Sequence, residues 1–402
     1  MIQLFKRLQS ATESATLRLN AAVQVLQKKG VQVWNLTAGE PDSFVPDSIK
    51  EAATRAIREN KSKYTPVPGI PELRDLIASR TNSQQPSLSS PWVRENVIVS
   101  NGAKQALCQA PMASLNEGDE VIIPAPYWLG YSEMVKLCGG TPKVLQTSLA
   151  DGFKLKPEAL KAALSPRTKA FMVNSPCNPT GLVYSKSELA ELAAVLKAHT
   201  SPVWVISDEI YDRLTYGNTP FCSFLEAAPQ YADYTVTING LSKSAAMTGW
   251  RVGWTVSNKK LAQAMSTLQG QLTSNVNSVA QWASLAAFSL PESYFATQLE
   301  SYKQRRDLVW KSLEKARHSR TIEVMAPQGA FYALVGVQAC LGEGETEGEL
   351  AERMLEECRV AVVPGTPFGA PGWIRMSFAT DERTLTEGCS RLVGFLEQAR
   401  KR

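Results

Sequence analysis

The fold is decided by one kind of stretch, clearest in Val203-Trp204-Val205-Ile206-Ser207-Asp208-Glu209-Ile210-Tyr211, where an apolar run passes directly into a polar cluster. Such runs are continuous and mostly β-branched, which is typical of strands buried on both faces of a sheet. Helical patterns alternate with them, for example at residues 104–115 and 187–199. This alternation predicts an α/β fold with a mainly parallel sheet. Its seven strands are expected near residues 97–99, 121–123, 143–145, 171–173, 203–206, 235–238 and 252–256.

The last hundred residues show a different pattern, in which helices and strands are mixed on a smaller scale. We predict a long charged helix at 292–316, strands at 331–335, 360–363 and 374–378, a helix at 347–358 and a final helix from Asp381. These elements indicate a second, smaller α+β domain. We expect a large domain at residues 47–295 and a small domain built from residues 1–46 and 296–402.

Composition argues against several functional classes. The 402 residues carry a net charge of only +5, and no basic stripe with interleaved aromatic residues appears, so no nucleic-acid partner is expected. The N-terminus lacks the apolar core of a signal peptide. The uncharged stretch 261–291 contains several Gln and Asn residues, so we read it as helix, loop and helix rather than a membrane span. We therefore expect a cytoplasmic protein without a membrane partner.

Histidine and cysteine usage narrows the chemistry further. Only His199 and His318 are present, and neither a His-Glu-x-x-His run nor a Cys-x-x-Cys pair occurs. A metal site is therefore not expected. The seven cysteines are scattered, which fits free thiols in a reducing compartment better than a disulfide framework.

Polar clusters follow four of the seven predicted strands. In an open α/β sheet, ligands bind outside the carboxyl ends of the strands. Each cluster alone could be turn chemistry, because Asn-Pro and Asn-Gly are common turn dipeptides. Four such clusters together favour a binding site instead, and they lie at residues 100–104, 174–181, 207–211 and 239–243.

With these residues placed, the sequence resembles the class I/II aminotransferases, the aspartate aminotransferase-like group of pyridoxal phosphate (PLP) enzymes. The resemblance implies PLP-dependent transferase fold type I, PLP as cofactor, and ping-pong amino transfer between an amino acid and a 2-oxo acid. It runs in family order over nearly the whole chain. The stretches that carry it are 36–42 (Leu-Thr-Ala-Gly-Glu-Pro-Asp), 64–69 (Tyr-Thr-Pro-Val-Pro-Gly), 178–181 (Asn-Pro-Thr-Gly), 207–211, 242–251 and Arg375.

The resemblance implies three catalytic residues. Lys243 is similar to the lysine that forms a Schiff base with PLP; its amine must be neutral to react, and a positive neighbour such as Arg251 can lower its pKa. Asp208 resembles the partner of the pyridinium nitrogen, which keeps the ring an effective electron sink. Tyr211, together with Asn178, resembles the donors to the phenolic oxygen. Without the resemblance, Lys243 could be a surface lysine and Asp208 a helix N-cap.

The PLP phosphate needs donors and positive charge. Gly102 and Ala103 open a predicted helix directly after a strand, so their N–H groups and the helix dipole can face an anion. Ser242 and Arg251 resemble the side-chain phosphate ligands. Tyr64 resembles the tyrosine that reaches the phosphate of the neighbouring subunit, which implies an obligate homodimer with shared active sites.

The resemblance also implies a site for the substrate α-carboxylate. Arg375 resembles the arginine that binds this group, and it lies in an apolar strand where an unpaired guanidinium is costly. Gly39 resembles a backbone donor to the same carboxylate. Trp128 resembles the aromatic residue that stacks on the pyridine ring, and Trp128 and Asn178 are expected to face both cofactor and substrate.

The substrate side chain is harder to infer. One branch of the family uses a partner-subunit arginine near the segment matching 274–275, but no Arg or Lys lies between Lys260 and Lys303. A second branch carries Gly-Gly-Lys-Gln-Ala-Leu, and residues 102–107 read Gly-Ala-Lys-Gln-Ala-Leu. Lys104 therefore favours a dicarboxylic substrate and is expected to border the cofactor; the rival reading is an exposed first-turn lysine.

That second branch also carries Lys-Pro-Ser-Ala-Thr, where residues 12–16 read Thr-Glu-Ser-Ala-Thr. Ser14 and Thr16 could still bond the substrate, but the missing lysine weakens the case for prephenate. The leading hypothesis is an aspartate:2-oxoglutarate aminotransferase. The alternatives are amino transfer to aromatic amino acids, alanine or prephenate, a PLP lyase, and a ligand-sensing regulator, for which too few residues precede Gly39 to hold a DNA-binding domain.

Overall fold

The computed structural model describes residues 15–400 of the chain. A seven-stranded sheet has the order β2-β8-β7-β6-β5-β3-β4, and only β8 runs antiparallel to its neighbours. The predicted mainly parallel sheet is therefore confirmed. Its strands are β2 (Val97–Asn101), β3 (Glu120–Ala125), β4 (Thr141–Gln146), β5 (Thr168–Asn174), β6 (Trp204–Asp208), β7 (Thr235–Gly240) and β8 (Val252–Val256).

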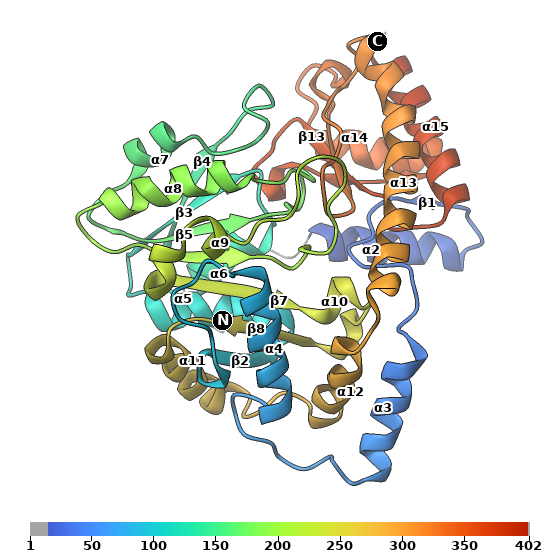
Figure 1. Cartoon of the computed structure of the whole chain (residues 1–402). Helices are drawn as coiled ribbons and strands as arrows, with labels where there is room; N and C mark the ends of the chain where they lie inside the picture. Colours follow the sequence, from blue (N-terminus) through green and yellow to red (C-terminus); the bar gives the residue numbers. More distant parts are fainter. Residues whose placement is uncertain (1–14, 401–402) are drawn as a thin grey trace, which may run out of the picture.

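The continuous apolar runs bury both faces of this sheet. Side chains alternate along a strand, so Val121 and Ile123 of β3 enter one core while Ile122 enters the other. One face is covered by α5 (Gly102–Ser114), α6 (Gly130–Leu137) and α11 (Lys259–Leu272). The opposite face is covered by α3 (Asp47–Arg58), α4 (Pro71–Gln84), α7 (Pro157–Ala163), α8 (Lys186–Ala198), α9 (Phe224–Ala227) and α12 (Ser278–Phe288) (Figure 1).

A third core lies around a four-stranded antiparallel sheet of order β12-β13-β10-β9. Its strands are β9 (Glu323–Val324), β10 (Tyr332–Gly336), β12 (Val363–Pro364) and β13 (Trp373–Ser377). Three helices accompany it: α13 (Glu292–His318), α14 (Glu347–Arg353) and α15 (Glu382–Ala399). This confirms the mixed helix and strand content expected for this part of the chain.

Segments from the first and the last part of the described chain meet beside this smaller sheet. After α2 (Ala15–Lys28), the short strand β1 (Trp34–Asn35) pairs in parallel with β11 (Val360–Ala361). Figure 1 shows α2 in blue close to the orange and red C-terminal elements. The predicted boundary at 295/296 falls inside α13, a continuous helix that extends from beside α12 along α15. The division into two domains stays a prediction.

Two local expectations need correction. The predicted helix 347–358 is α-helical only to Arg353, and a π-helical turn, Met354–Cys358, completes it. The predicted strand 360–363 is two strands that pair with different partners, because β11 joins β1 and β12 joins β13. The stretch 261–291 contains most of α11 and the whole of α12, as expected. None of the helices among residues 15–400 is long and apolar enough to span a membrane.

Candidate active site

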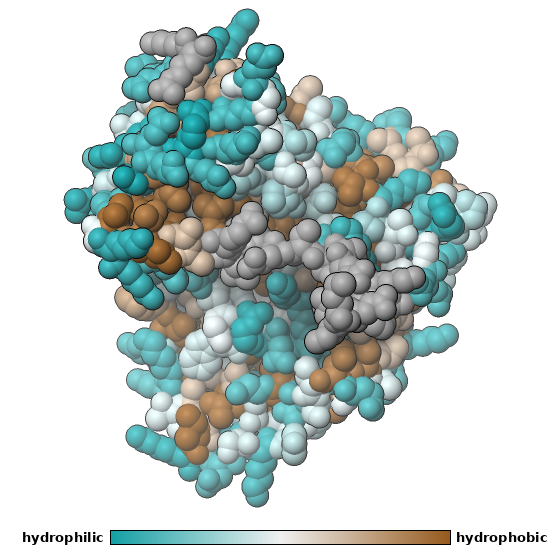
Figure 2. Space-filling view, turned by 180° about the vertical axis from the view of Figure 1, so that it is seen from behind, coloured by the Kyte–Doolittle hydropathy of each residue, from teal (hydrophilic) through white to brown (hydrophobic). Residues whose placement is uncertain are grey.

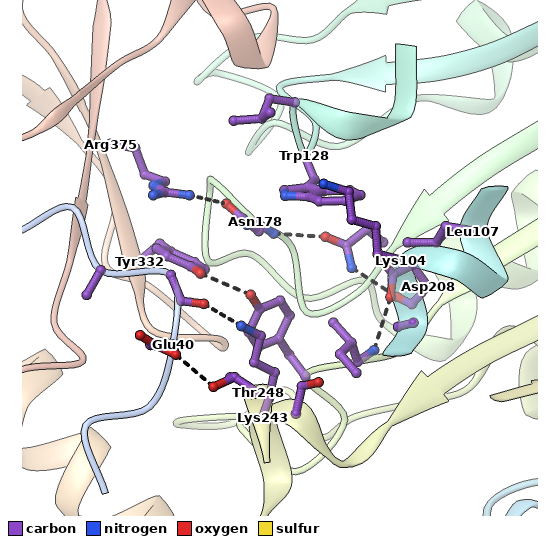
Figure 3. Close-up of a pocket in the computed structure, with 18 of the residues that line it drawn as sticks. Glu40, Lys104, Leu107, Trp128, Asn178, Asp208, Lys243, Thr248, Tyr332 and Arg375 are labelled. Atoms are coloured by element: carbon purple, nitrogen blue, oxygen red, sulfur yellow. Dashed lines mark hydrogen bonds between the residues drawn. The ribbon is translucent and has the colours of Figure 1, made fainter. Parts of the chain in front are cut away.

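A cavity of about 610 Å³ lies where the carboxyl ends of the central strands face the smaller sheet. Its walls come from the ends of β5 and β6, the N-terminus of α5, the segment after β7, the loop before α3, β10 and β13. Figure 3 shows these side chains pointing toward a common centre. Eleven residues predicted from the sequence line it: Gly39, Ala103, Lys104, Trp128, Asn178, Asp208, Tyr211, Ser242, Lys243, Arg251 and Arg375.

Two predicted site residues do not line the cavity, and two others are not described. Gly102 sits directly beneath the Arg251 guanidinium, next to the cavity wall. Tyr64 is 91% exposed and does not line the cavity of its own chain. Ser14 and the side chain of Thr16 lie outside the described residues. The structure therefore brings together the predicted site residues that follow the strands of the large sheet.

Lys243 reaches into the cavity from α10 (Leu241–Ser244), the short helix that follows β7. Its Nζ donates a hydrogen bond to the carbonyl oxygen of Gly39. Loss of solvation, together with the charges of Arg375 and Arg251, lowers the pKa of Lys243 to about 8 against the opposing charges of Glu40 and Asp208. Burial, rather than the positive neighbour expected from the sequence, is the largest cause. The amine is therefore poised to be neutral close to physiological pH.

Asp208 ends β6, and it is only 5% exposed. Its Oδ2 accepts a hydrogen bond of 2.6 Å from the Tyr131 hydroxyl, and its Oδ1 accepts one of 3.2 Å from the backbone N–H of Ile210. Burial raises the pKa of Asp208 to about 6, while these two bonds and the charge of Lys243 oppose that rise. The carboxylate is therefore held in place and charged at neutral pH.

Tyr131 was missed by the sequence reasoning. It lies in the first turn of α6, where its ring contacts Trp128 edge to face with centroids 5.4 Å apart. One tyrosine thus touches both the Asp208 carboxylate and the predicted stacking residue. The only signal in the sequence is its position three residues after Trp128, which equally suits a core aromatic.

Arg375, on β13, is the most unusual charge in the cavity. It is 2% exposed, and its Nη atoms donate to the side-chain oxygen of Asn178 at 3.2 Å and the backbone oxygen of Thr37 at 3.0 Å. Its guanidinium also lies over the rings of Tyr332 and Phe368, at 4.5 and 4.9 Å. Its Nε has no partner, and no carboxylate between residues 15 and 400 forms an ion pair with it. A buried, uncompensated cation prepares this wall for an anion.

Tyr211 and Tyr332 form a pair of buried phenols beside Arg375. Their hydroxyls are 3.0 Å apart, and burial raises the pKa of both, so both stay neutral. Tyr332 was not predicted, since it begins an apolar strand and reads as core. Nearby, Asn174 connects two predicted residues: its Oδ1 accepts from the N–H of Asn178 at 2.9 Å, and its Nδ2 donates to the backbone oxygen of Asp208 at 2.9 Å.

The N-terminus of α5 and Arg251 form a close-packed cradle. A Cβ built on Gly102, whose φ is +75°, would lie 2.5 Å from Nη2 of Arg251. A Cβ on Gly253 would collide with the backbone nitrogen of Ala103. The Arg251 Nη1 donates to the backbone oxygen of Thr248 at 2.8 Å, which fixes the guanidinium beside the helix terminus. The glycines allow backbone N–H groups and a guanidinium to face one anion, as phosphate recognition requires.

Two side chains complete the opening of the cavity. Lys104 is exposed in the first turn of α5, with its Nζ 5.6 Å from the centre of the Trp128 ring. Glu40, which sequence reasoning did not single out, accepts a hydrogen bond of 2.7 Å from the Thr248 hydroxyl. The mouth therefore carries one cation and one anion, and the anion lies beside Lys243 (Figure 3).

Comparison with known proteins agrees with this geometry. An aspartate/prephenate aminotransferase from Cereibacter sphaeroides is 42% identical over 95% of this chain and 96% of its own. An aspartate aminotransferase from Geobacillus stearothermophilus is 41% identical over 98% of this chain and 99% of its own. The solved structure of Thermus thermophilus aspartate aminotransferase with maleate superposes with a TM-score of 0.91 at 40% identity, covering 98% of this chain and 100% of that one. The family model for aminotransferase class I and II matches residues 31–392, and the chain belongs to that family.

Proposed function

We propose that this chain is a PLP-dependent aspartate:2-oxoglutarate aminotransferase. The observation that carries the proposal is that one cavity holds both the Lys243 amine, whose pKa is lowered, and the buried Arg375 guanidinium, with which no carboxylate among residues 15–400 pairs. An α-amino acid or 2-oxo acid offers that cation the missing anion. Relatives named as aspartate or aspartate/prephenate aminotransferases support the substrate class.

The donor set fits PLP. The Asp208 carboxylate would hold a protonated ring nitrogen, and the N-terminus of α5 with Arg251 would hold the phosphate. Tyr211 and Asn178 would face the phenolic oxygen. When bound, PLP supplies an electron sink that makes the α-proton of an amino acid acidic.

Lys243 would move the proton that this chemistry releases. With a pKa of about 8, roughly a tenth of the amine is neutral at pH 7, and a larger share at higher pH. The neutral Nζ can accept the proton from the substrate Cα, and the ammonium can deliver it on the other half of the reaction. General acid–base transfer of this kind contributes about 10²–10⁴-fold in rate.

Arg375 would bind the α-carboxylate through two parallel hydrogen bonds from its guanidinium. With the carboxylate held there, the substrate Cα would face Lys243. Its present bonds to Asn178 and Thr37 keep the planar group oriented before substrate arrives. Lys104, exposed at the mouth, would meet the distal carboxylate of aspartate or glutamate. The maleate in the matched Thermus structure is a dicarboxylate, which supports this assignment.

Prephenate is a second candidate substrate, because several relatives carry it in their names. Residues 12 and 13, which depart from the family pattern for it, lie outside the described residues. We test the substrate with a panel of aspartate, glutamate, alanine, phenylalanine and tyrosine as donors to 2-oxoglutarate, and with prephenate as acceptor. The proposal expects the highest kcat/KM for aspartate. A preference for alanine or an aromatic donor would reject the dicarboxylate assignment while leaving amino transfer intact.

We also propose a homodimer in which Tyr64 completes the phosphate site of the partner subunit. Tyr64 is almost fully exposed, as are Phe44 and, to a lesser degree, Ile57. Figure 2 shows hydrophobic side chains reaching the surface in several groups among hydrophilic ones.

The seven cysteines are all free, which supports a cytoplasmic location. The division into domains at 46/47 and 295/296 is likewise proposed.

A further inference from the structure

Two cysteines from different helices meet on the outer side of α5. Cys108 lies one turn after Lys104 on α5, and Cys138 is the C-cap of α6. The Cys138 thiol donates to the backbone oxygen of Cys108 at 3.6 Å, and the Cys138 side chain lies close enough to the Cys108 sulfur to affect its titration. Their approach joins parts of the chain thirty residues apart.

The other five cysteines have different surroundings. The thiols of Cys177, Cys222, Cys340 and Cys358 each donate to a backbone oxygen. Cys389 is buried in the core of the smaller sheet. Among the described residues, a thiol beside a second thiol is thus found at Cys108 and Cys138.

The surroundings of Cys108 favour its reactive form. The hydrogen bond from Cys138 and the charge of Lys104 lower the pKa of Cys108 to about 7, against the effect of burial. About half of a thiol with that pKa is thiolate at neutral pH, and the thiolate is the nucleophile in disulfide exchange. Cys222 provides a contrast within the same chain, because burial raises its pKa to about 11.

We propose that Cys108 and Cys138 form a reversible disulfide, which makes this pair an oxidative modification site. The oxidant is a disulfide of the glutathione class. The Cys108 thiolate attacks one sulfur of the oxidant and releases the first glutathione thiolate. The Cys138 thiol then loses its proton to solvent, attacks the Cys108 sulfur and releases the second. Two electrons pass to the oxidant, and one S–S bond forms in the protein.

The backbone around the pair suits this closure. A disulfide needs its sulfurs about 2.05 Å apart, so the thiols must move closer than a hydrogen bond allows. Cys138 lies at the end of α6 and is followed by Gly139 in a left-handed conformation, with φ +85°. The moving residue therefore belongs to a helix terminus and turn, not to the middle of a strand.

Cys108 and Cys138 lie on two helices that adjoin the cavity. α5 carries Ala103, Lys104 and Leu107 into the cavity, and α6 begins just after Trp128 and Leu129, which also line it. The disulfide would covalently link the α5 and α6 sides of the cavity, and it would do so without involving Lys243. In a reducing compartment such a disulfide is transient, which is typical of redox-sensing pairs.

The test uses the purified holoenzyme and a series of glutathione buffers from fully reduced to fully oxidised. After acid quenching and alkylation, trypsin places Cys108 in peptide 105–136 and Cys138 in peptide 137–143. We expect a linked pair of these peptides to accumulate with oxidant and to disappear with dithiothreitol. Cys138→Ser should instead accumulate glutathione on Cys108, whereas the control Cys222→Ser should form the same link as wild type.

A second measurement separates reactivity from disulfide geometry. The alkylation rate of Cys108 should rise with a midpoint near pH 7 in wild type and at a higher pH in Cys138→Ala, because alanine has no hydrogen-bond donor whereas serine would keep one. Three outcomes would each overturn the proposal. They are glutathione that stays on Cys108 of wild type without a Cys108–Cys138 link, a different cysteine pair that links first, and equal alkylation midpoints in both proteins. None of these readouts depends on amino transfer, so they stand apart from the proposed function.

Discussion

The bond from Tyr131 to Asp208 can be tested by removing one oxygen atom, in Tyr131→Phe. The hydroxyl donates to a buried carboxylate at 2.6 Å, and both residues are shielded from solvent, so the bond is not weakened by screening. A hydrogen bond to a charged group contributes about 1.5–3 kcal/mol. At about 1.4 kcal/mol per tenfold change in proton affinity, its loss should move the titration of Asp208 upward by about one to two pH units.

The direction in which Tyr131→Phe moves the pKa of Asp208 follows from what already shifts that pKa. Burial already raises the pKa of Asp208 to about 6, and Tyr131 stabilises only the ionised form. Without the hydroxyl, the carboxyl stays protonated to higher pH and cannot pair with a protonated PLP ring. The affinity of the apoenzyme for PLP should therefore fall about threefold to twenty-five-fold at pH 6.5 and approach the wild-type value at pH 8.5.

The assay is PLP binding to the apoenzyme from pH 5.5 to 8.5, read by quenching of tryptophan fluorescence. The ratio of variant to wild-type affinity cancels the titrations of PLP and Lys243, which both proteins share. Tyr231→Phe is the matched control, because its buried hydroxyl bonds only the backbone oxygen of Val203 at 2.9 Å. A variant-to-wild-type ratio that stays constant across this pH range would refute the reasoning.

Four further outcomes are expected. Lys243→Ala should lose turnover and the visible absorbance of the bound cofactor, measured by spectrophotometry; surviving turnover would contradict its role. Lys104→Ala should raise KM about tenfold for aspartate and leave KM for alanine unchanged. Tenfold corresponds to the lower end of the free energy of a charge-assisted hydrogen bond, because Lys104 is exposed. Equal effects on both donors would count against it. Mixed Tyr64→Ala and Lys243→Ala subunits should recover about a quarter of wild-type activity, since half of randomly formed dimers hold one intact site; no recovery would argue against shared sites. Gly102→Ala should cost about 1–2 kcal/mol through its left-handed backbone and weaken PLP binding by crowding Arg251, checked by thermal denaturation and titration.

The sequence predicted correctly those features that are visible in a short continuous stretch of the chain. The seven strands were visible because buried parallel strands are continuous apolar runs, and Asp208 and Lys243 were visible because they follow such runs directly. Arg375 stood out because a charge inside an apolar strand needs an explanation. The roles assigned to these residues remain proposals, although the cavity contains all three.

Other features could not be seen in the sequence because they depend on tertiary packing. Tyr131 and Tyr332 lie in patterns that fit core aromatics, and only the folded chain aims their hydroxyls at Asp208 and Tyr211. The desolvation that lowers the pKa of Lys243 comes from elements distant in sequence. The run at 360–363 divides between two sheets because each half meets a different partner, which no local pattern records.

The lone buried guanidinium of Arg375 has a kinetic consequence. In the proposed function, an amino acid and a 2-oxo acid both present the same α-carboxylate to Arg375, so one cation would serve the incoming substrate of each half-reaction in turn. The two substrates cannot occupy the cavity together, and double-reciprocal plots at fixed second substrate should be parallel. High concentrations of either one should also inhibit, because the acid that arrives out of turn blocks the same wall.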